Sequence, residues 1–285
     1  MTKGTAVPRP SLRAKLVVWL FCLCGLVPLR AAAQTPADDA VLNLAQPDFT
    51  VVNLPTSLRL PRWKSAFRLT HRFTRPINCD DELRCPDNFF EDFFGLDNGA
   101  IIGLEYRMGI APNLQVGVQR ARIDKTIDIF GEYGVTRQAG RMPLEIAARL
   151  GIEGTNNFRD EYSFTAGAIV SHFITDRVAI HVDPFWAGNT NQVSTDGDDS
   201  TFLVGFGVRL RVLPTVYLVG EYTPRFAGYQ PGPDSASFAI EKRAGGHVFQ
   251  LNVSNSFAGT IGQLANGAPN SHDWYLGFNL SRKFY

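Results

Sequence analysis

Charged side chains recur at alternate positions of several apolar segments, where they could line or fill a polar interior. Lys64, Arg68 and Arg72 are four residues apart, so an extended strand would place them in one basic column at intervals of about 13 Å. A column of one sign favours anions if it faces a water-filled path. Eight basic and eight acidic residues occupy such positions: Lys64, Arg68, Arg72, Arg107, Arg149, Arg209, Arg211, Lys283, Glu105, Asp128, Glu132, Glu145, Glu153, Asp183, Glu221 and Glu241. Because the two signs balance, wall-to-wall ion pairs that fill the interior are an equal alternative to a selective pore.

Hydrolysis is a further alternative. His181 and Asp183 are two residues apart on the same face of an extended segment, and a carboxylate beside an imidazole could orient a general base. Ser171 and His172 are adjacent, so a strand points them to opposite sides and does not make a dyad of them. The sequence has no phosphate-binding loop, dinucleotide fingerprint, zinc spacing or haem-attachment motif. We therefore expect no catalytic residue, no metal and no cofactor.

The N-terminus carries the features of an export signal. Basic residues precede a 14-residue apolar stretch over 16–29, and Ala31, Ala32 and Ala33 provide a cleavage site. That stretch is shorter than the roughly 20 residues that span a bilayer as a helix. We predict a signal peptide over residues 1–33, a periplasmic lead-in over 34–62 and a single domain over 63–285.

Cys79 and Cys85 remain after removal of the signal peptide, in the polar segment INCDDELRCPD. An exported chain meets an oxidising compartment, so we predict a local disulfide between them. A metal site is the alternative, but it would need ligands that the neighbouring residues do not supply.

Period-two alternation of apolar residues dominates the rest of the chain and predicts strands. In Phe202, Val204, Phe206 and Val208, for example, the apolar residues fall at every second position. Twelve segments show the pattern: 63–73, 100–110, 114–122, 126–135, 144–153, 162–174, 178–187, 201–212, 216–224, 236–242, 247–255 and 274–284. Most have about the 9–11 residues that a tilted transmembrane strand needs.

The connections distinguish a membrane barrel from a soluble sandwich, in which alternation would look the same. Long polar connections alternate with short ones such as 111–113, 175–177 and 213–215, as in outer-membrane barrels with short periplasmic turns. The final segment alternates and ends on Phe284 and Tyr285, as expected of a strand that barrel-assembly machinery reads. Aromatic residues near strand ends on the apolar face fit interfacial belts: Trp63, Phe73, Tyr133, Tyr162, Trp186, Phe202, Tyr222 and Trp274. The sequence predicts an all-β, antiparallel, up-and-down transmembrane barrel of about 12 strands.

Several stretches resemble an uncharacterised bacterial outer-membrane β-barrel family, domain of unknown function 5777. The resemblance covers about residues 58–285 and is most specific in the Gly-Gly-His-Val-Phe-Gln-Leu run that begins at Gly245. The other stretches are FRLTHRF at 67–73, NFFEDFFGLD at 88–97, DKT at 124–126 and LGFNLSRKF at 276–284. The resemblance implies an outer-membrane barrel and supplies no catalytic residues.

We therefore expect a bacterial outer-membrane protein surrounded by lipid, with no nucleic-acid partner, since the formal net charge is only +1. The expected role is a structural barrel or a narrow, weakly anion-preferring pore. The alternatives are a binding platform formed by the surface loops and, less favoured, a hydrolase. Phe89, Phe90, Phe93 and Phe94 would lie in such a loop, where they could form a plug, contact the outer leaflet or simply pack together.

Overall fold

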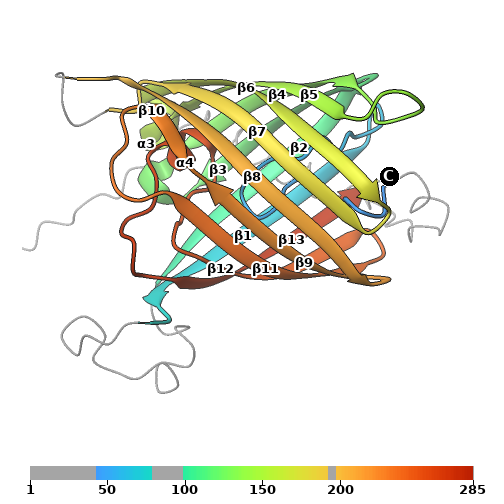
Figure 1. Ribbon diagram of the computed structural model, residues 1–285. Coiled ribbons are helices and arrows are strands. Elements are labelled where there is room, and N and C mark those ends of the chain that lie inside the picture. The colour runs from blue at the N-terminus through green and yellow to red at the C-terminus, as the bar shows by residue number, and fades with distance from the viewer. Residues whose placement is uncertain (1–42, 79–98, 192–196, 285) are drawn as a thin grey trace, which may run out of the picture. The chain divides into compact units, whose positions relative to one another are not determined.

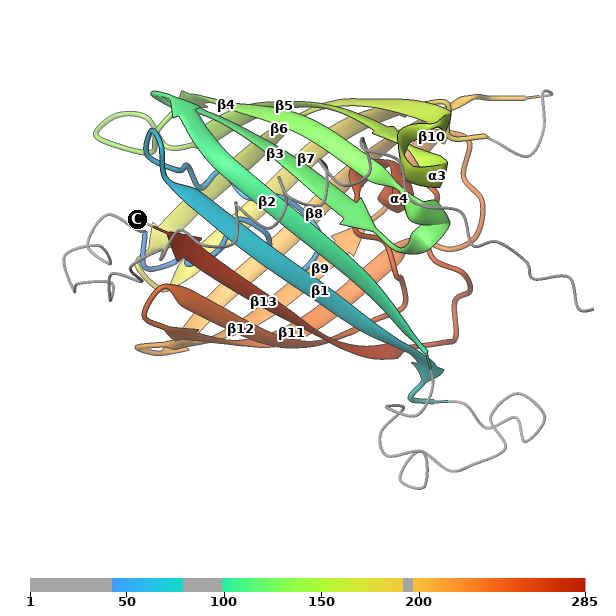
Figure 2. The same cartoon turned by 180° about the vertical axis from the view of Figure 1, so that it is seen from behind.

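The computed structural model describes residues 43–78, 99–191 and 197–284, which form an antiparallel β-barrel (Figure 1, Figure 2). The predicted signal peptide over 1–33, the Cys79–Cys85 disulfide and the phenylalanines of 89–94 lie outside these residues. The strands are β1 (Ser65–Pro76), β2 (Ala100–Ala111), β3 (Leu114–Ala121), β4 (Ile127–Thr136), β5 (Glu145–Gly154), β6 (Asp160–Thr175), β7 (Val178–Gly188), β8 (Ser200–Leu213), β9 (Val216–Thr223), β10 (Arg225–Gly228), β11 (Ser235–Ala244), β12 (His247–Ser254) and β13 (Tyr275–Phe284).

The sheet closes on itself. β1 pairs with both β2 and β13, and β8 pairs with β7 and β9, so the pairing runs continuously around the barrel. β9 and β10 are two parts of one transmembrane segment, interrupted at Pro224, which has no N–H to donate to the ladder. The barrel therefore has twelve transmembrane segments, and the predicted fold class is confirmed. The segment predicted at 236–242 extends further, over β11.

Alternation places apolar side chains on the outside of the barrel and polar or small ones inside. In β8, Phe202, Phe206, Val208 and Leu210 are exposed, whereas the intervening residues from Thr201 to Arg209 are buried. An apolar outer wall of this kind requires lipid around it. Among the aromatic residues predicted at strand ends, Phe73 differs: it is buried because it packs against the rings of His71 and Phe278.

The two ends of the barrel differ in their connections. One end, here called the turn end, carries the two-residue turns 112–113, 176–177, 214–215 and 245–246 together with the connection 137–144. The other, the loop end, carries the remaining connections and, among the described residues, three short helices: η2 (Ile123–Lys125), α3 (Thr155–Phe158) and α4 (Ile261–Ala265). In the described part of the chain, no helix is long and apolar enough to cross a membrane.

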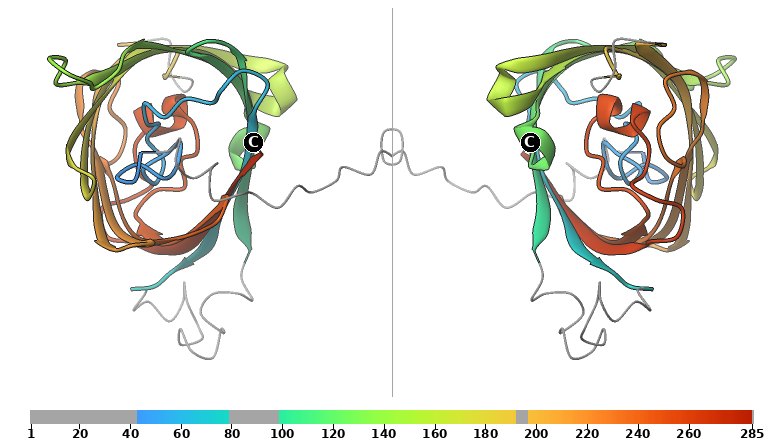
Figure 3. Two further views of the ribbon diagram at one scale, coloured as in Figure 1. Left: turned by 90° about the vertical axis from the view of Figure 1, so that its right-hand side faces the viewer. Right: turned by 90° about the vertical axis from the view of Figure 1, so that its left-hand side faces the viewer.

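The interior contains two chain segments as well as wall side chains. Residues 43–62, here called the plug, run inside the ring of strands, and so does α4, as the end-on views show (Figure 3). Val51, Val52 and Leu54 of the plug form one buried apolar cluster with Ile261 and Leu264 of α4. Most of the apolar core of this barrel thus lies within its lumen.

Candidate functional site in the barrel lumen

The plug is a hairpin that reaches from the turn end into the middle of the barrel. Its tip closes with a hydrogen bond from the Val51 N–H to the Leu54 carbonyl, 2.8 Å, within a bridge between Thr50 and Pro55. Residues 43–62 belong to the segment predicted as a periplasmic lead-in over 34–62, but they lie inside the barrel. The physical reason is that Val51, Val52 and Leu54 are apolar and fully buried where they lie.

Glycines on the barrel wall make room for the plug tip. A Cβ atom at Gly205 would lie 2.3 Å from Cδ2 of Leu54, and one at Gly207 would lie 2.9 Å from Cγ2 of Val51. Both distances are far below van der Waals contact, so side chains at these two positions would displace the tip. The inward glycines of β8 therefore accommodate a second segment of the chain.

Glu221 of β9 holds the tip of the plug through three consecutive backbone groups. Its Oε2 accepts the N–H groups of Val52, Asn53 and Leu54 at 2.9, 2.8 and 2.9 Å. Its Oε1 accepts the Asn53 side-chain amide at 3.1 Å. A carboxylate that receives several N–H groups makes charge-assisted hydrogen bonds, which are roughly twice as strong as neutral ones. The acceptor capacity of Glu221 is thus largely occupied by the plug.

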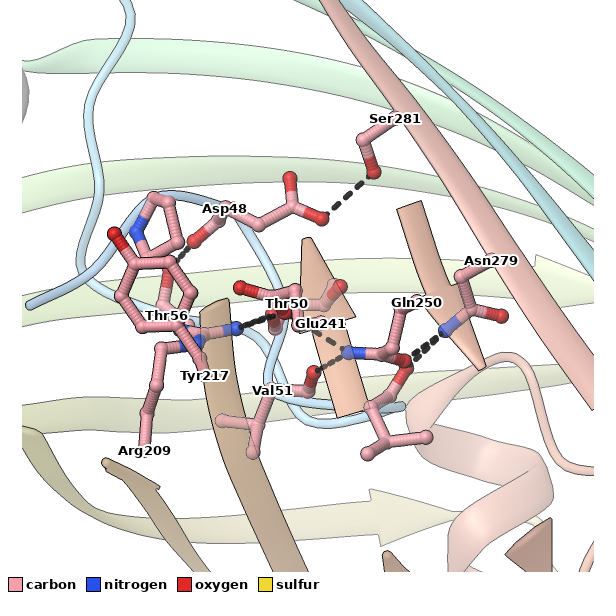
Figure 4. Close-up of polar contacts among 12 residues, drawn as sticks. Asp48, Thr50, Val51, Thr56, Arg209, Tyr217, Glu241, Gln250, Asn279 and Ser281 are labelled. Carbon is pink, nitrogen blue, oxygen red and sulfur yellow. Dashed lines mark hydrogen bonds and ion pairs between the residues drawn. The ribbon is translucent and has the colours of Figure 1, made fainter. Parts of the chain in front are cut away.

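Other wall side chains donate hydrogen bonds to the carbonyl groups of the same tip (Figure 4). Arg209 donates to the Thr50 carbonyl at 2.8 Å, Gln250 to the Val51 carbonyl at 2.7 Å and Asn279 to the Val52 carbonyl at 3.2 Å. From β1, Arg68 also donates to the Val52 carbonyl, and Arg72 donates to Asn53 Oδ1 at 3.0 Å. Because these contacts satisfy an irregular backbone inside the barrel, the plug can be buried without loss of hydrogen bonding.

The two stems of the plug are fixed nearer the turn end. On one stem, Ser281 donates to Asp48 Oδ2 at 2.7 Å and Lys283 donates to the Pro47 carbonyl. On the other, Ser57 donates to Ser171 Oγ at 2.8 Å and Gln115 donates to the Leu58 carbonyl at 2.9 Å. The plug therefore contacts wall strands on several sides of the lumen.

A separate ion-pair network covers the inner wall of β2, β4 and β5. Arg107 Nε lies 2.6 Å from Glu105 Oε1, and Arg149 Nη2 lies 3.3 Å from Asp128 Oδ2. Both guanidinium groups also lie 3.9 Å from Oε2 of Glu132. The ring of Phe130 lies between the two arginines, with centroid distances of 5.2 and 3.6 Å. Opposite charges on β2, β4 and β5 therefore neutralise one another. The interpretation of the interior as filled by ion pairs predicts such a network.

A loop folds into the lumen from the loop end. This lumen loop, residues 256–268, contains α4, whose N-cap residue Thr260 accepts the N–H of Gln263 at 3.2 Å. Gln119 of β3 donates to its Gly259 carbonyl at 2.6 Å. The cavity between the lumen loop and the plug tip measures about 10 Å³, which is room for about one water molecule. Plug and lumen loop together fill the middle of the barrel.

The sixteen charged residues that the sequence predicts on the inner face fall into two groups. Thirteen are buried in the lumen: Arg68, Arg72, Glu105, Arg107, Asp128, Glu132, Arg149, Glu153, Asp183, Arg209, Glu221, Glu241 and Lys283. Lys64, Glu145 and Arg211 lie near the turn end and are partly exposed, and Arg211 pairs with Asp176 at 3.1 Å. Arg68 and Arg72 of the basic column bind the plug, so with the plug seated these two side chains do not face open water.

The histidine proposed as a general base occupies a buried position. His181 Nδ1 lies 3.0 Å from Ser171 Oγ, a pairing across β6 and β7 that sequence adjacency could not reveal. Asp183 Oδ1 accepts the backbone N–H of Val170 at 3.1 Å. Ser171 and His181 are both fully buried, and Ser57 of the plug covers the serine. This arrangement gives a substrate no access to the pair.

Sequence reasoning missed the uncharged residues that hold the plug. Gln115, Gln250 and Asn279 each fall at inward positions of alternating strands, and this was the signal that could have found them. The prediction considered charged residues only and left these amides out. An amide side chain can nevertheless accept a hydrogen bond from a backbone N–H and donate one to a carbonyl.

Comparison with solved structures finds outer-membrane barrels of similar fold. A KdgM porin in complex with disordered oligogalacturonate has a TM-score of 0.48 and 9% identity, covering 78% of this chain and 99% of that chain. A NanC porin has a TM-score of 0.46 and 6% identity, with the same shares covered. The COG4313 outer membrane channel from Pseudomonas putida F1 has a TM-score of 0.47 and 10% identity, covering 79% of this chain and 97% of that one. These resemblances concern the fold alone.

A search of curated protein sequences found no match. A family model described as a membrane bound beta barrel domain, DUF5777, matches residues 48–284, from within the plug to the end of the last strand. The match confirms the resemblance that the strand sequences indicated. The chain belongs to this DUF5777 family of membrane-bound β-barrel domains.

Proposed function

We propose that this protein is an outer-membrane barrel that is closed at rest, and that withdrawal of the plug opens a narrow pore for small solutes. The observation that carries the proposal is the plug itself: its tip is held by Glu221 on one side and by Arg209, Gln250 and Asn279 on the other. By analogy with barrels of this class, the turn end faces the periplasm and the loop end faces the cell exterior.

The path of the plug supports its withdrawal as a unit. Leu44 accepts a hydrogen bond from the hydroxyl of Tyr217, at the start of β9, and Leu60 and Pro61 lie against Gly109, at the end of β2. Both stems therefore reach the turn end, and the hairpin can leave without threading through the barrel. Many of its contacts with the wall are hydrogen bonds, which water can replace at modest net cost, whereas the burial of Val51, Val52 and Leu54 opposes withdrawal.

Planar-bilayer conductance tests the proposal. The mature full-length chain should show little current, and a variant that lacks residues 43–62 should conduct steadily. A heat-modifiable shift in gel mobility serves as the control that both chains form barrels. Equal conductance of the two folded chains would refute the plug as the closing element, and a folded deletion variant that stays closed would refute the pore beneath it.

The weak anion preference belongs to the opened barrel. After withdrawal of the plug, Arg68 and Arg72 would lose their carbonyl partners and face water. In the deletion variant, Arg68→Glu with Arg72→Glu should therefore move the reversal potential toward cations, whereas Arg141→Glu, on the exposed connection 137–144, should leave it unchanged. If the reversal potential is unchanged in the Arg68→Glu, Arg72→Glu variant as well as in the Arg141→Glu control, the basic column does not line the ion path.

A catalytic role is not proposed. The Ser171–His181 pair lies beneath the plug, and its partner on the serine side is Ser57. We infer a non-enzymatic barrel from this burial.

A further inference from the structure

A second feature of the lumen lies at its turn end, where the plug leaves a pocket of about 290 Å³ against the barrel wall. The plug contributes Arg59 and Arg62 to its lining, and the wall contributes Asn113, Arg137 and Glu145. Its volume is close to that of small-ligand sites. The pocket is separate from the contacts at the plug tip.

The polar groups of the pocket are unequally matched. Arg59 Nη1 and Arg137 Nη2 share a single neutral acceptor, Asn113 Oδ1, at 3.2 and 3.3 Å. Three guanidinium groups line the pocket with one carboxylate, Glu145, whose Oε1 is 4.0 Å from Arg59 Nε. Two positive charges therefore remain uncompensated among the lining residues.

Arg59 is the residue of this site whose side chain is buried and held in place by hydrogen bonds. Its side chain is only 7% exposed, and it donates to the carbonyl groups of Thr136 and Ile146. Its Nε, by contrast, has no hydrogen-bond partner among the described residues. Burial lowers the pKa of Arg59, with a smaller opposing effect of Glu145 and a further lowering by Arg137. An anion would offset the cost of burying the positive charge of Arg59. It would also reduce the repulsion between the guanidinium groups of Arg59 and Arg137.

We propose that this pocket binds a phosphate group, held between Arg59 of the plug and Arg137 of the connection 137–144. Inorganic phosphate or a phosphate monoester, with a charge of about −1.5 to −2 at pH 7, can neutralise the two uncompensated charges, and its oxygens suit the forked geometry of guanidinium groups. The phosphate can come from such a soluble compound or from a phospholipid headgroup, whose phosphodiester carries one negative charge and would neutralise one of the two. In either case the ligand joins the plug to the wall, so its binding stabilises the seated plug by mass action. The proposal rests on the seated position of the plug, and it does not require that the barrel conduct.

Binding of inorganic phosphate to the full-length chain in maltoside detergent, measured by calorimetry with chloride at equal ionic strength as the reference, tests the first source. Arg137→Gln should weaken binding about tenfold or more, since it removes a charge-assisted contact. Arg141→Gln is the matched control, because Arg141 lies on the same connection outside the pocket, and it should bind like the parent chain. Removal of residues 43–62 should abolish binding, because Arg59 is lost with them.

Native mass spectrometry after extraction from membranes tests the second source. If the ligand is a phospholipid, the parent chain and Arg141→Gln should retain it and Arg137→Gln should release it, even where inorganic phosphate binds weakly. Saturable phosphate binding without retained lipid would identify a soluble ligand. The proposal is overturned if Arg137→Gln matches the parent chain in both measurements. A plug that stays seated but never opens would leave these results intact and would contradict only the proposed pore.

Discussion

Glu221 is the single residue on which the position of the plug most depends. It receives three successive backbone N–H groups, and such a cluster forms only where the chain turns sharply enough to direct them at one point. The neighbouring Arg209 is paired with Glu241 at 3.1 Å while it also holds the Thr50 carbonyl. Charges that a sequence pattern can only assign to the interior thus act here as hydrogen-bond partners of a second segment.

The small residues of β8 lead to a testable prediction. Gly205→Val should prevent Leu54 from seating, since even a Cβ atom would lie 2.3 Å from the Leu54 side chain. Overpacking typically costs about 1–3 kcal/mol, and here it should act on the plug more than on the barrel. Limited proteolysis should then cut within residues 43–62 faster than in the parent chain.

Gly131→Val is the matched control for that substitution. A Cβ atom at Gly131, on β4, meets nothing within 4 Å, so the proteolysis rate should not change. Equal cleavage rates for both variants and the parent chain would show that Leu54 does not depend on the space at Gly205.

At the scale of elements, the strands were predictable and the plug was not. Strict alternation along β8 or β13 reflects a wall with lipid on one side and a polar interior on the other, and that contrast is visible in any single strand. Val51, Val52 and Leu54 show no such period, because an irregular hairpin is held by partners far away in the sequence. Asn53, for example, contacts Glu221, which is 168 residues away. The sequence therefore predicts which charges face inward but not what they bind.

A cross-link between plug and wall tests this element directly. Ser57 Oγ and Ser171 Oγ are 2.8 Å apart, so Ser57→Cys with Ser171→Cys should form a disulfide in the folded barrel. Cys79 and Cys85 are replaced by serine in this background. A mass shift on reduction, or a mobility change on a non-reducing gel, reports the bond.

Ser57→Cys with Ser163→Cys serves as the control pair. Ser163 is buried in the same strand, β6, but donates to the Gly188 carbonyl near the loop end. This pair should remain reduced. A disulfide in the control pair, or its absence from the first pair, would contradict the described position of the plug.

At the scale of the whole molecule, the barrel is filled from both ends. The plug rises from the turn end, the lumen loop descends from the loop end, and their apolar side chains meet in one cluster with the wall. Removing one partner of a buried ion pair such as Arg107–Glu105 would cost about 3–5 kcal/mol, because the other charge would remain buried without a partner. Since none of the paired strands of the barrel comes from the plug, its displacement would leave the wall intact.

The most direct test of a displaceable plug is the conductance of the Ser57→Cys, Ser171→Cys protein before and after reduction, with urea on the turn-end side to loosen the plug. The oxidised protein should stay closed, and a reductant added to the same bilayer should produce openings. Equal current through the oxidised and the reduced protein would contradict it, because ions would then pass by a route that the plug does not control.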